Sequence, residues 1–393
     1  MTLKIQSLVA AMALSASGIA AANDESMFSF SGFGTVGIAH SNLEGADVTP
    51  DVQSEHGVGA TDSTTARLDS RVALQMDVRF NDDLSAVVQA VSEYANTESW
   101  KPEISLAHLK YRFSPQLAVR LGRITTPLYM LSEYQRVGYA FPGVRQPNEV
   151  YNYLMPMDGI EAMYTITAGE TVVGLQAFYG DVDSTRVKVS DMMGGSITVD
   201  RGNHTFRVGH VRGDASYSTA QIEQLFTAYA ALPYPGVAAV ADRLDPRDMF
   251  GTFNSVGYRY DQGNWFLRAE AIQIDFVPSV NGQSTAGYIN AGIRHGAWTP
   301  SLTFSHLDSS HLDAPGAADP IGLLNAAVAR NNQGRHALTA ALRWDFMPQM
   351  AAKIEASHVK NHAGSYGNLG NIQDQYVPGS SYNLLSASID FVF

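Results

Sequence analysis

The sequence contains no cysteine, few charged residues and no long apolar run. Because cysteine is absent from all 393 residues, a disulfide framework, a thiolate nucleophile and a cysteine-based metal site are excluded. Only 16% of the residues are charged and 45% are hydrophobic, yet no uninterrupted apolar stretch reaches the length of a membrane helix. The formal net charge of -12 and the lack of a dominant basic patch argue against nucleic acid as a partner.

The hydrophobic residues are instead dispersed at alternate positions. In the segment Arg67–Phe80, every second residue from Leu68 is almost always apolar, and the residues between them are mostly charged. A β-strand directs successive side chains to opposite faces, so one face of this segment suits an apolar medium and the other suits water. The pattern recurs along the chain, which also carries 34 Gly, 18 Tyr and 17 Phe. It predicts an all-β fold: a transmembrane antiparallel β-barrel of about 16 strands around an aqueous lumen.

The N-terminus has the features of a cleaved signal peptide, predicted at residues 1–22. Lys4 precedes the apolar stretch Ile5–Leu14, and the small residues Ala20–Ala22 follow. This order of a positive charge, a short apolar region and a small-residue site is typical of secretory signals. We therefore expect export from the cytoplasm and a single barrel domain over residues 23–393.

Long and short polar connections alternate along the predicted strands. Short links such as 81–83 and 261–264 alternate with long ones at 125–157, 218–249 and 309–334, as in bacterial barrels with periplasmic turns and longer external loops. Ser218 followed by Gln221 resembles a capping box, and Asp319 before Pro320 resembles a helix start, so short helices are expected in the last two loops. The least defined region is 181–217, where we expect a short strand near Ser196–Asp200.

Charged residues on the water-facing phase of the strands are candidates for a pore constriction. Arg67 and Arg71 share that phase with Lys110, Arg112 and Arg120 on neighbouring strands, whereas Arg123 is one step out of phase. On the lipid side an arginine at mid-depth would cost about 2–4 kcal/mol, so these side chains belong in water. Each one, taken singly, is equally well explained as part of a solvated inner wall.

The segment 125–157 is rich in aromatic and aliphatic residues for a solvated loop, which favours a loop folded into the barrel. Its Glu133 and Glu149, with Glu161 on the next strand, are expected to oppose the arginines and produce a transverse field that selects among small solutes. An external lid or a subunit contact is the alternative. We expect weak anion preference or little preference, and a shift toward cations when Arg71 and Arg112 are replaced by Ser. The predicted constriction comprises Arg67, Arg71, Lys110, Arg112, Arg120, Arg123, Glu133, Glu149 and Glu161.

Four segments together resemble the Gram-negative general porin superfamily: Phe28–Ile38 (FSFSGFGTVGI), Leu121–Arg123 (LGR), Asp158–Tyr164 (DGIEAMY) and Phe391–Phe393 (FVF). The resemblance implies a sixteen-stranded homotrimer in the outer membrane, with the third external loop, 125–157, folded inward as the constriction. It also implies that Phe393, with Phe391, is part of the signal read by the barrel-assembly machinery. Outer-membrane lipid, lipopolysaccharide and small hydrophilic solutes are the other expected partners. The long acidic run typical of the constriction loop of enteric members is missing, which leaves the sign of the selectivity open.

The predicted function is a water-filled channel for passive diffusion of ions and small hydrophilic solutes. No Gly-x-Ser-x-Gly elbow or His-Glu-x-x-His helix is present, and the 11 histidines are scattered, so we expect no enzyme activity, catalytic residue, cofactor or metal. A substrate-specific or anion-selective channel remains an alternative. A non-conducting adhesin and an enzyme with its site at the barrel rim are further alternatives.

Overall fold

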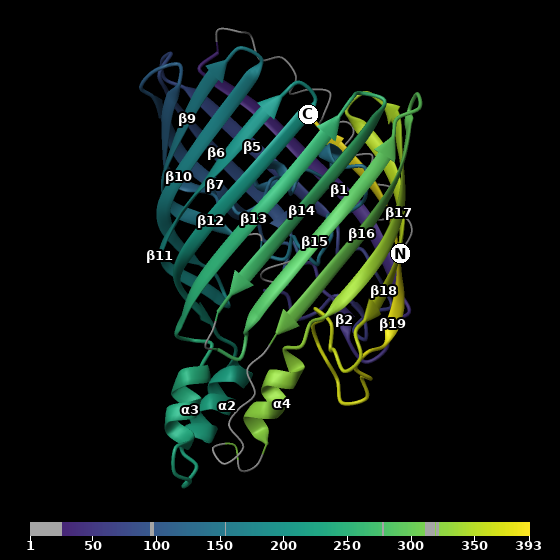
Figure 1. Cartoon of the computed structure of the whole chain (residues 1–393). Helices are drawn as coiled ribbons and strands as arrows, with labels where there is room; N and C mark the ends of the chain where they lie inside the picture. The colour runs from purple at the N-terminus through teal and green to yellow at the C-terminus, as the bar shows by residue number, and fades with distance from the viewer. Residues whose placement is uncertain (1–25, 95–97, 154, 277–278, 311–318, 320–321) are drawn as a thin grey trace.

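One antiparallel sheet closes on itself to form a barrel (Figure 1). The computed structural model describes residues 26–94, 98–153, 155–276, 279–310, 319 and 322–393, so the predicted signal peptide lies outside the described residues. The sheet has 17 strands, of which β4 (Thr64–Thr65) is only two residues long. The other sixteen form the wall, and β1 pairs with β19 to close it. The predicted fold class, a transmembrane antiparallel β-barrel of about sixteen strands, is therefore confirmed.

The wall strands follow one another in chain order, each hydrogen-bonded to the next. They are β1 (Phe28–Ser41), β5 (Arg71–Arg79), β6 (Leu84–Glu93), β7 (Glu103–Arg112), β8 (Leu117–Thr125), β9 (Pro156–Ala168), β10 (Thr171–Asp183), β11 (Val187–Arg201), β12 (His204–Tyr217), β13 (Met249–Asp261), β14 (Trp265–Asp275), β15 (Gln283–Ile293), β16 (Trp298–Ser310), β17 (Arg335–Met347), β18 (Met350–Asn361) and β19 (Ser381–Val392). A short hairpin of β2 (Asp47–Val48) and β3 (Val58–Gly59) lies in the first external loop.

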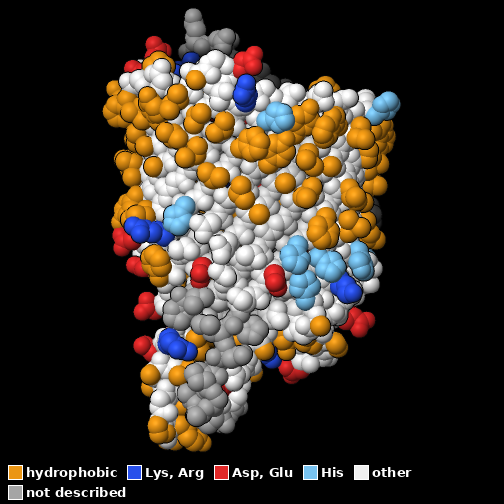
Figure 2. All heavy atoms as spheres, in the orientation of Figure 1, with side chains coloured by type: hydrophobic (Ala, Val, Ile, Leu, Met, Phe, Trp, Pro, Cys, Tyr) orange, Lys and Arg blue, Asp and Glu red, His pale blue; other side chains and the backbone are white. Residues whose placement is uncertain are grey.

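The outer face of the wall is apolar and ends in aromatic side chains. On β12, Phe206 and Val208 are 54% and 51% exposed, whereas Arg207 between them points inward and is buried. Near the short turns the outward aromatic rings pair across strands, as in Trp298–Trp344 with centroids 5.3 Å apart. Figure 2 shows hydrophobic side chains over this end of the barrel. This arrangement fits an apolar band with an aromatic girdle at the membrane interface.

The strands β5 and β11 differ from the sequence prediction. β5 begins at Arg71 rather than Arg67. Where a short strand was expected near Ser196–Asp200, β11 is a long strand joined to β10 by the turn 184–186. Here the polar residue Lys188 faces outward while Val187 faces inward and is buried, so the alternation is reversed relative to the opening segment. A bulge between Ser190 and Met193 further shifts the register, and it obscured the two-residue period.

The helices lie beyond the strand ends opposite the short turns (Figure 1). They are α2 (Ala220–Ala230), α3 (Val237–Leu244) and α4 (Leu323–Arg330), and their buried apolar residues form one cluster. The N-cap of α2 is Thr219, one residue after the expected Ser218, and its hydroxyl accepts a hydrogen bond from Ile222 N. Asp319 accepts from the backbone of α4, while Pro320 lies outside the described residues. None of the described helices is long and apolar enough to cross a membrane.

Candidate functional site

The segment 126–155 crosses the inside of the barrel between β8 and β9. It contains two short 3-10 helices, η1 (Ser132–Tyr134) and η2 (Gly138–Ala140), and we call it the crossing loop. Met130 N donates to Glu270 Oε1 on β14 at 2.7 Å, and Arg136 Nε donates to Glu93 Oε1 on β6 at 3.1 Å. In the strand order of the sheet, half of the wall separates β6 from β14. The loop therefore spans the interior from one wall to the other.

Apolar packing holds the loop against the wall formed by β9 to β16. Tyr129, Leu131 and Tyr151 of the loop are at most 3% exposed, and they belong to one cluster with inner-face residues such as Phe253 and Ile272. The rings of Tyr129 and Phe253 meet edge to face with centroids 5.3 Å apart. Burying each such side chain stabilises the arrangement by about 1.5–3 kcal/mol. This packing accounts for the aromatic content that distinguished the segment in the sequence.

Cations of the wall donate to carbonyl oxygens of the same loop. On β18, Lys353 Nζ donates to Gly138 O at 2.6 Å and to Gly143 O at 2.9 Å. The same nitrogen lies 3.1 Å from Asp390 on β19, and neither side chain of this pair is exposed. Arg343 on β17 donates to two further loop carbonyls. Each bond satisfies a loop carbonyl that irregular backbone would otherwise leave unpaired away from water.

Three of the sequence-predicted residues meet at one end of the loop. Arg120 on β8 forms a salt bridge with Glu161, its register partner on β9. Its Nη2 also lies 2.6 Å from Glu133 Oε1 on the loop. The two carboxylates bind the same guanidinium directly, so they do not oppose it across open water as the sequence reading expected. Glu149 is likewise paired, with Arg335 Nε at 2.7 Å.

Arg71 takes part in a second cluster, which is centred on Glu93. Its Nη1 lies 3.6 Å from one oxygen of Glu93, and Arg136 lies against the other oxygen. One carboxylate is thus shared by two guanidinium groups. Arg145 has the opposite balance, because it faces both Asp69 at 2.6 Å and Glu355 at 3.7 Å.

The other four predicted residues lie away from the crossing loop. Arg67 precedes β5 on the external side, where it is exposed and pairs with Asp62 at 3.3 Å. Lys110 and Arg112 are exposed on β7 beside the turn 80–83, and Arg112 lies 3.6 Å from Asp83. Arg123 lies on the outer phase of β8 and pairs with its register partner Asp158 at 2.7 Å. Lys110 and Arg112 do lie on the inward face of β7, as the alternation predicted. They lie near the periplasmic turn, however, and not at the depth of the crossing loop.

Sequence reasoning did not include three inward arginines of β12 to β14 in the constriction. Arg207 donates to Pro127 O at 2.6 Å and Leu128 O at 3.0 Å. Arg259 and Arg268 are register partners on adjacent strands. Within the described part of the chain, none of the three forms a salt bridge with a carboxylate. The alternation predicted that Arg268 faces inward, but nothing in the sequence showed that it would lack a partner.

The predicted assembly signal lies at the seam between β1 and β19. Phe393 N donates to Gly32 O at 3.0 Å, and Gly32 N donates to Phe393 O at 2.9 Å. The rings of Phe391 and Phe393 cover Gly34 and Gly32, where an added Cβ would lie 2.3 Å and 2.4 Å from the nearest ring atoms. The seam thus depends on small residues in β1.

One group of metal-type ligands occurs among the described residues, at the external rim. It consists of Glu55, His56 and Glu98. Glu98 Oε1 accepts hydrogen bonds from the backbone nitrogens of both Glu55 and His56 at 2.9 Å. Its position and bonds indicate that this carboxylate joins the first and second external loops.

A closed barrel with a lipid-facing exterior, a charged lumen and a loop across that lumen defines an outer-membrane channel protein. The profile of the Gram-negative porin family matches residues 7–364. The chain belongs to this family, whose members are non-enzymatic channels of the Gram-negative outer membrane. The predicted porin function, the outer-membrane location and the absence of enzyme activity are therefore confirmed.

Solved structures share the fold at low sequence identity. The anion-selective porin from Comamonas acidovorans has a TM-score of 0.57 and 14% identity, over 93% of this chain and 99% of that chain. The outer membrane channel DcaP of Acinetobacter baumannii has a TM-score of 0.57 and 13% identity, over 95% and 100%. Salmonella typhi OmpF in complex with daunomycin has a TM-score of 0.55 and 12% identity, over 93% and 97%. No curated protein is significantly similar in sequence.

Proposed function

We propose that this porin prefers anions weakly and that solutes pass between the crossing loop and the wall, with the loop as the constriction. The observation that carries the proposal is the set of Arg207, Arg259 and Arg268, which face inward without a carboxylate partner among the described residues. Several other inward charges of the described residues are paired, as in Arg335 with Glu149. The unpaired arginines therefore supply the net field that a permeating ion meets.

Neighbouring arginines favour an anion because they repel one another. Arg259 and Arg268 are held at paired positions of β13 and β14, and an anion between them removes part of the repulsion. Glu270 lies on the same wall, but its carboxylate accepts from Met130 N and from the Tyr151 hydroxyl. It therefore offsets the arginines only in part. The porin from Comamonas acidovorans, which is named as anion-selective, has the same fold.

The constriction proposed from the sequence is accordingly revised. Arg71, Arg120, Glu133, Glu149 and Glu161 remain in it because they contact the loop or lie beside its contacts. We assign Lys110 and Arg112 to the periplasmic mouth, Arg67 to the external rim and Arg123 to the outer surface.

The test is the zero-current potential of the purified porin in a planar lipid bilayer under a potassium chloride gradient. The wild type is expected to show a zero-current potential whose sign indicates that chloride permeates better than potassium. The double variant Arg259→Gln/Arg268→Gln should move the potential toward cation preference. Arg201→Gln changes an exposed arginine at the end of β11 and should leave the potential unchanged. Identical potentials for the wild type and the double variant would remove these arginines from the selectivity mechanism.

We also propose that the porin is a homotrimer in contact with outer-membrane lipid and lipopolysaccharide, inserted by the barrel-assembly machinery. Two observations support this assembly: porins of this family are typically trimeric, and a Vibrio cholerae OmpT structure at 10% identity is described as a trimer form. Native mass spectrometry of the detergent-solubilised protein should give three times the protomer mass. A monomer as the largest species would contradict the proposal. The same spectrum would show whether the mature chain starts near Asn23, as the predicted signal peptide requires.

A further inference from the structure

We propose that the external vestibule of this porin binds uncharged aromatic solutes that carry a hydroxyl or amide group. The vestibule contains a cavity of about 580 Å³ between the inner faces of β10 to β14 and the external loops. Cavities of this size are typical of small-molecule sites. The inference goes beyond ion conduction because it assigns a binding site on the external side of the crossing loop.

One side of the cavity is an apolar wall. It is formed by inward side chains at the external ends of consecutive strands, which are Val182, Val187, Met192, Val211, Phe253 and Ile274. The lumen of a water-filled barrel is ordinarily polar and its exterior apolar. Here the outward neighbours, such as Asp181, Lys188 and Asp214, are charged and exposed. The reversed pattern creates an apolar surface inside the channel, which favours contact with the face of an aromatic ring.

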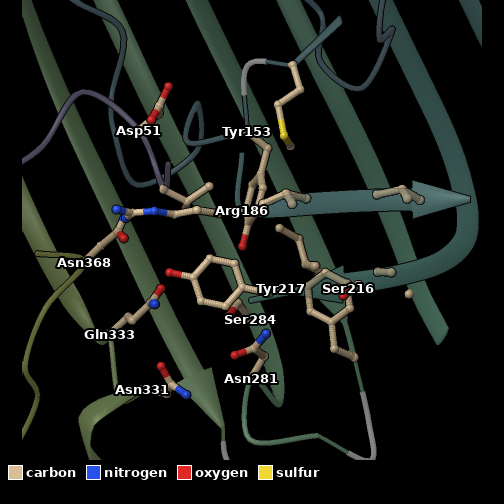
Figure 3. A pocket seen from close by; sticks show the side chains of 18 of the residues that line it. Asp51, Tyr153, Arg186, Ser216, Tyr217, Asn281, Ser284, Asn331, Gln333 and Asn368 are labelled. Atoms are coloured by element: carbon tan, nitrogen blue, oxygen red, sulfur yellow. The ribbon is translucent and has the colours of Figure 1, made fainter. Parts of the chain in front are cut away.

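The opposite side of the cavity carries amide groups. Asn281, Asn331 and Gln333 point toward the space in front of Tyr217 (Figure 3). Asn331 Nδ2 donates to Val280 O at 3.2 Å. In the described ranges, no group donates a hydrogen bond to the side-chain oxygens of these three amides. Those oxygens are therefore available to a hydroxyl or amide hydrogen of a solute.

Two charged groups of the cavity already have partners, which favours an uncharged occupant beside them. Arg186 forms a salt bridge with Glu55. Asp51 is 4% exposed and accepts hydrogen bonds from Gln53 N and Ser54 N within its own loop. A charged solute would lose hydration without gaining a free counter-charge from these groups. Arg212, which also lines the cavity, donates to Met193 Sδ at 3.4 Å, and Arg330 at the end of α4 is exposed. An uncharged ring with a polar edge matches both walls.

The experiment uses 4-hydroxybenzamide as the probe in single-channel recordings, added on the external side. The wild type is expected to show interruptions of the ion current whose frequency rises with probe concentration. Arabinose, which is polar and has no ring, should produce none. If both solutes interrupt the current equally, obstruction at the crossing loop explains the effect and the proposed site is wrong.

Isosteric variants test the apolar wall. In Val187→Thr/Val211→Thr each substitution replaces a methyl group by a hydroxyl at almost constant shape. The residence time of the probe should fall by about fourfold per methyl group, from the transfer free energy of one methylene. Val359→Thr makes the same change on β18, outside this cavity, and should leave the residence time unchanged.

Two further outcomes would overturn the proposal: no interruptions in the wild type, or equal shortening by Val359→Thr and by the double variant. The ion current without the probe should be the same in all three proteins, which shows that each variant is folded. The residence time of the probe is measured independently of the zero-current potential. The aromatic site can therefore be tested even if the porin shows no anion preference.

Discussion

The Lys353 ammonium group is completely buried in the barrel. It has two roles: its ion pair with Asp390 stabilises the folded protein, and its hydrogen bonds to Gly138 O and Gly143 O hold the crossing loop. Replacing it in Lys353→Met leaves Asp390 buried without a cation, although Thr35 Oγ1 still donates to it at 2.5 Å. Breaking a buried ion pair in this way typically costs about 3–5 kcal/mol. We expect that loss in urea unfolding of the porin in lipid vesicles, together with a noisier single-channel current because two loop carbonyls lose their donor.

The double variant Lys353→Met/Asp390→Leu separates the two effects. Replacing both charges by apolar groups should restore most of the stability. The noisy current should remain, since Gly138 O and Gly143 O still lack the ammonium group. Equal stability of the single and double variants would contradict the role of the ion pair.

Asp51 provides a prediction for pH. Burial raises the pKa of Asp51 to about 6, and a hydrogen bond from Gln53 N opposes this rise, while Glu93 adds to it and Arg136 opposes it. Because the folded-state pKa lies above the ordinary value of 3.8, the associated stabilisation is complete below that value and is lost as the pH rises through 6. Asp51→Asn should therefore match the wild type in thermal midpoint at acidic pH and exceed it at neutral pH.

Thermal unfolding at about pH 4 and about pH 7.5, on either side of the titration, measures this difference. Asp62→Asn is the control, since the Asp62 side chain is 47% exposed. The difference in thermal midpoint between this variant and the wild type should not increase from acidic to neutral pH as it does for Asp51→Asn. A gap between Asp51→Asn and the wild type that is constant with pH would show that the carboxyl does not titrate in this range.

At the scale of single residues, the sequence predicted which face of the strand a side chain lies on better than which residues that side chain contacts. Alternation correctly predicted that Arg120 faces inward, because that property depends only on local phase. It did not predict that both Glu161 and Glu133 bind Arg120 directly, because that contact requires the path of the loop. Arg112 was in phase but lies beside the turn 80–83, since depth depends on where each strand begins.

At the scale of elements, the seam between β1 and β19 is the place where a small change should affect closure. Gly34→Val would place a Cβ 2.3 Å from Phe391 Cζ and displace the ring. Overpacking of this kind typically costs about 1–3 kcal/mol. We expect a smaller fraction of folded barrel after refolding into detergent micelles, measured by migration of unheated samples on gels.

Gly174→Val on β10 is the matched control, because its added Cβ would meet nothing nearer than 4.0 Å. The pair Gly34→Val/Phe391→Ala should recover folded barrel relative to Gly34→Val, since the clash is removed. If Gly174→Val refolds as poorly as Gly34→Val, loss of glycine alone is responsible and the proposed clash is wrong.

Strand prediction failed where the inner wall is apolar. In β11 the buried side chains Val187 and Met192 face inward, so the pattern of apolar residues facing lipid was not recognised there, and only a short strand near Ser196–Asp200 was predicted. Lys188 and Asp191 both lie on the outward face, and these charged residues could have identified it. They are three positions apart because of a bulge, whereas residues on one face of a regular strand are an even number of positions apart. The error therefore falls on the strands that form the proposed aromatic site.

At the scale of the whole molecule, the barrel was predictable because its requirements repeat. Every wall strand must bond to two neighbours and match lipid on one face, so the alternation and the turns recur around the sheet. The crossing loop has no such repetition. Its apolar content favoured an inward position, but its partners on β6, β14 and β18 are distant in sequence.

The proposed anion preference should depend on salt because it arises from a field rather than from a tight site. The chain carries a net charge of -12, while Arg207, Arg259 and Arg268 face the lumen without a carboxylate partner among the described residues. The Debye length falls from about 10 Å at 0.1 M salt to about 3 Å at 1 M. The ratio of chloride to potassium permeability should therefore approach unity as salt rises. A ratio that is unchanged by salt would instead indicate a specific anion-binding site.

The crossing loop also acts as a mechanical brace. Its bonds from Arg207 on β12 and Lys353 on β18, together with those to β6 and β14, connect walls that would move apart or together if the barrel became oval. Stretching or thinning the bilayer therefore has to break buried bonds before the cross-section changes. The current through a single barrel should accordingly stay constant under membrane tension until the protein itself unfolds.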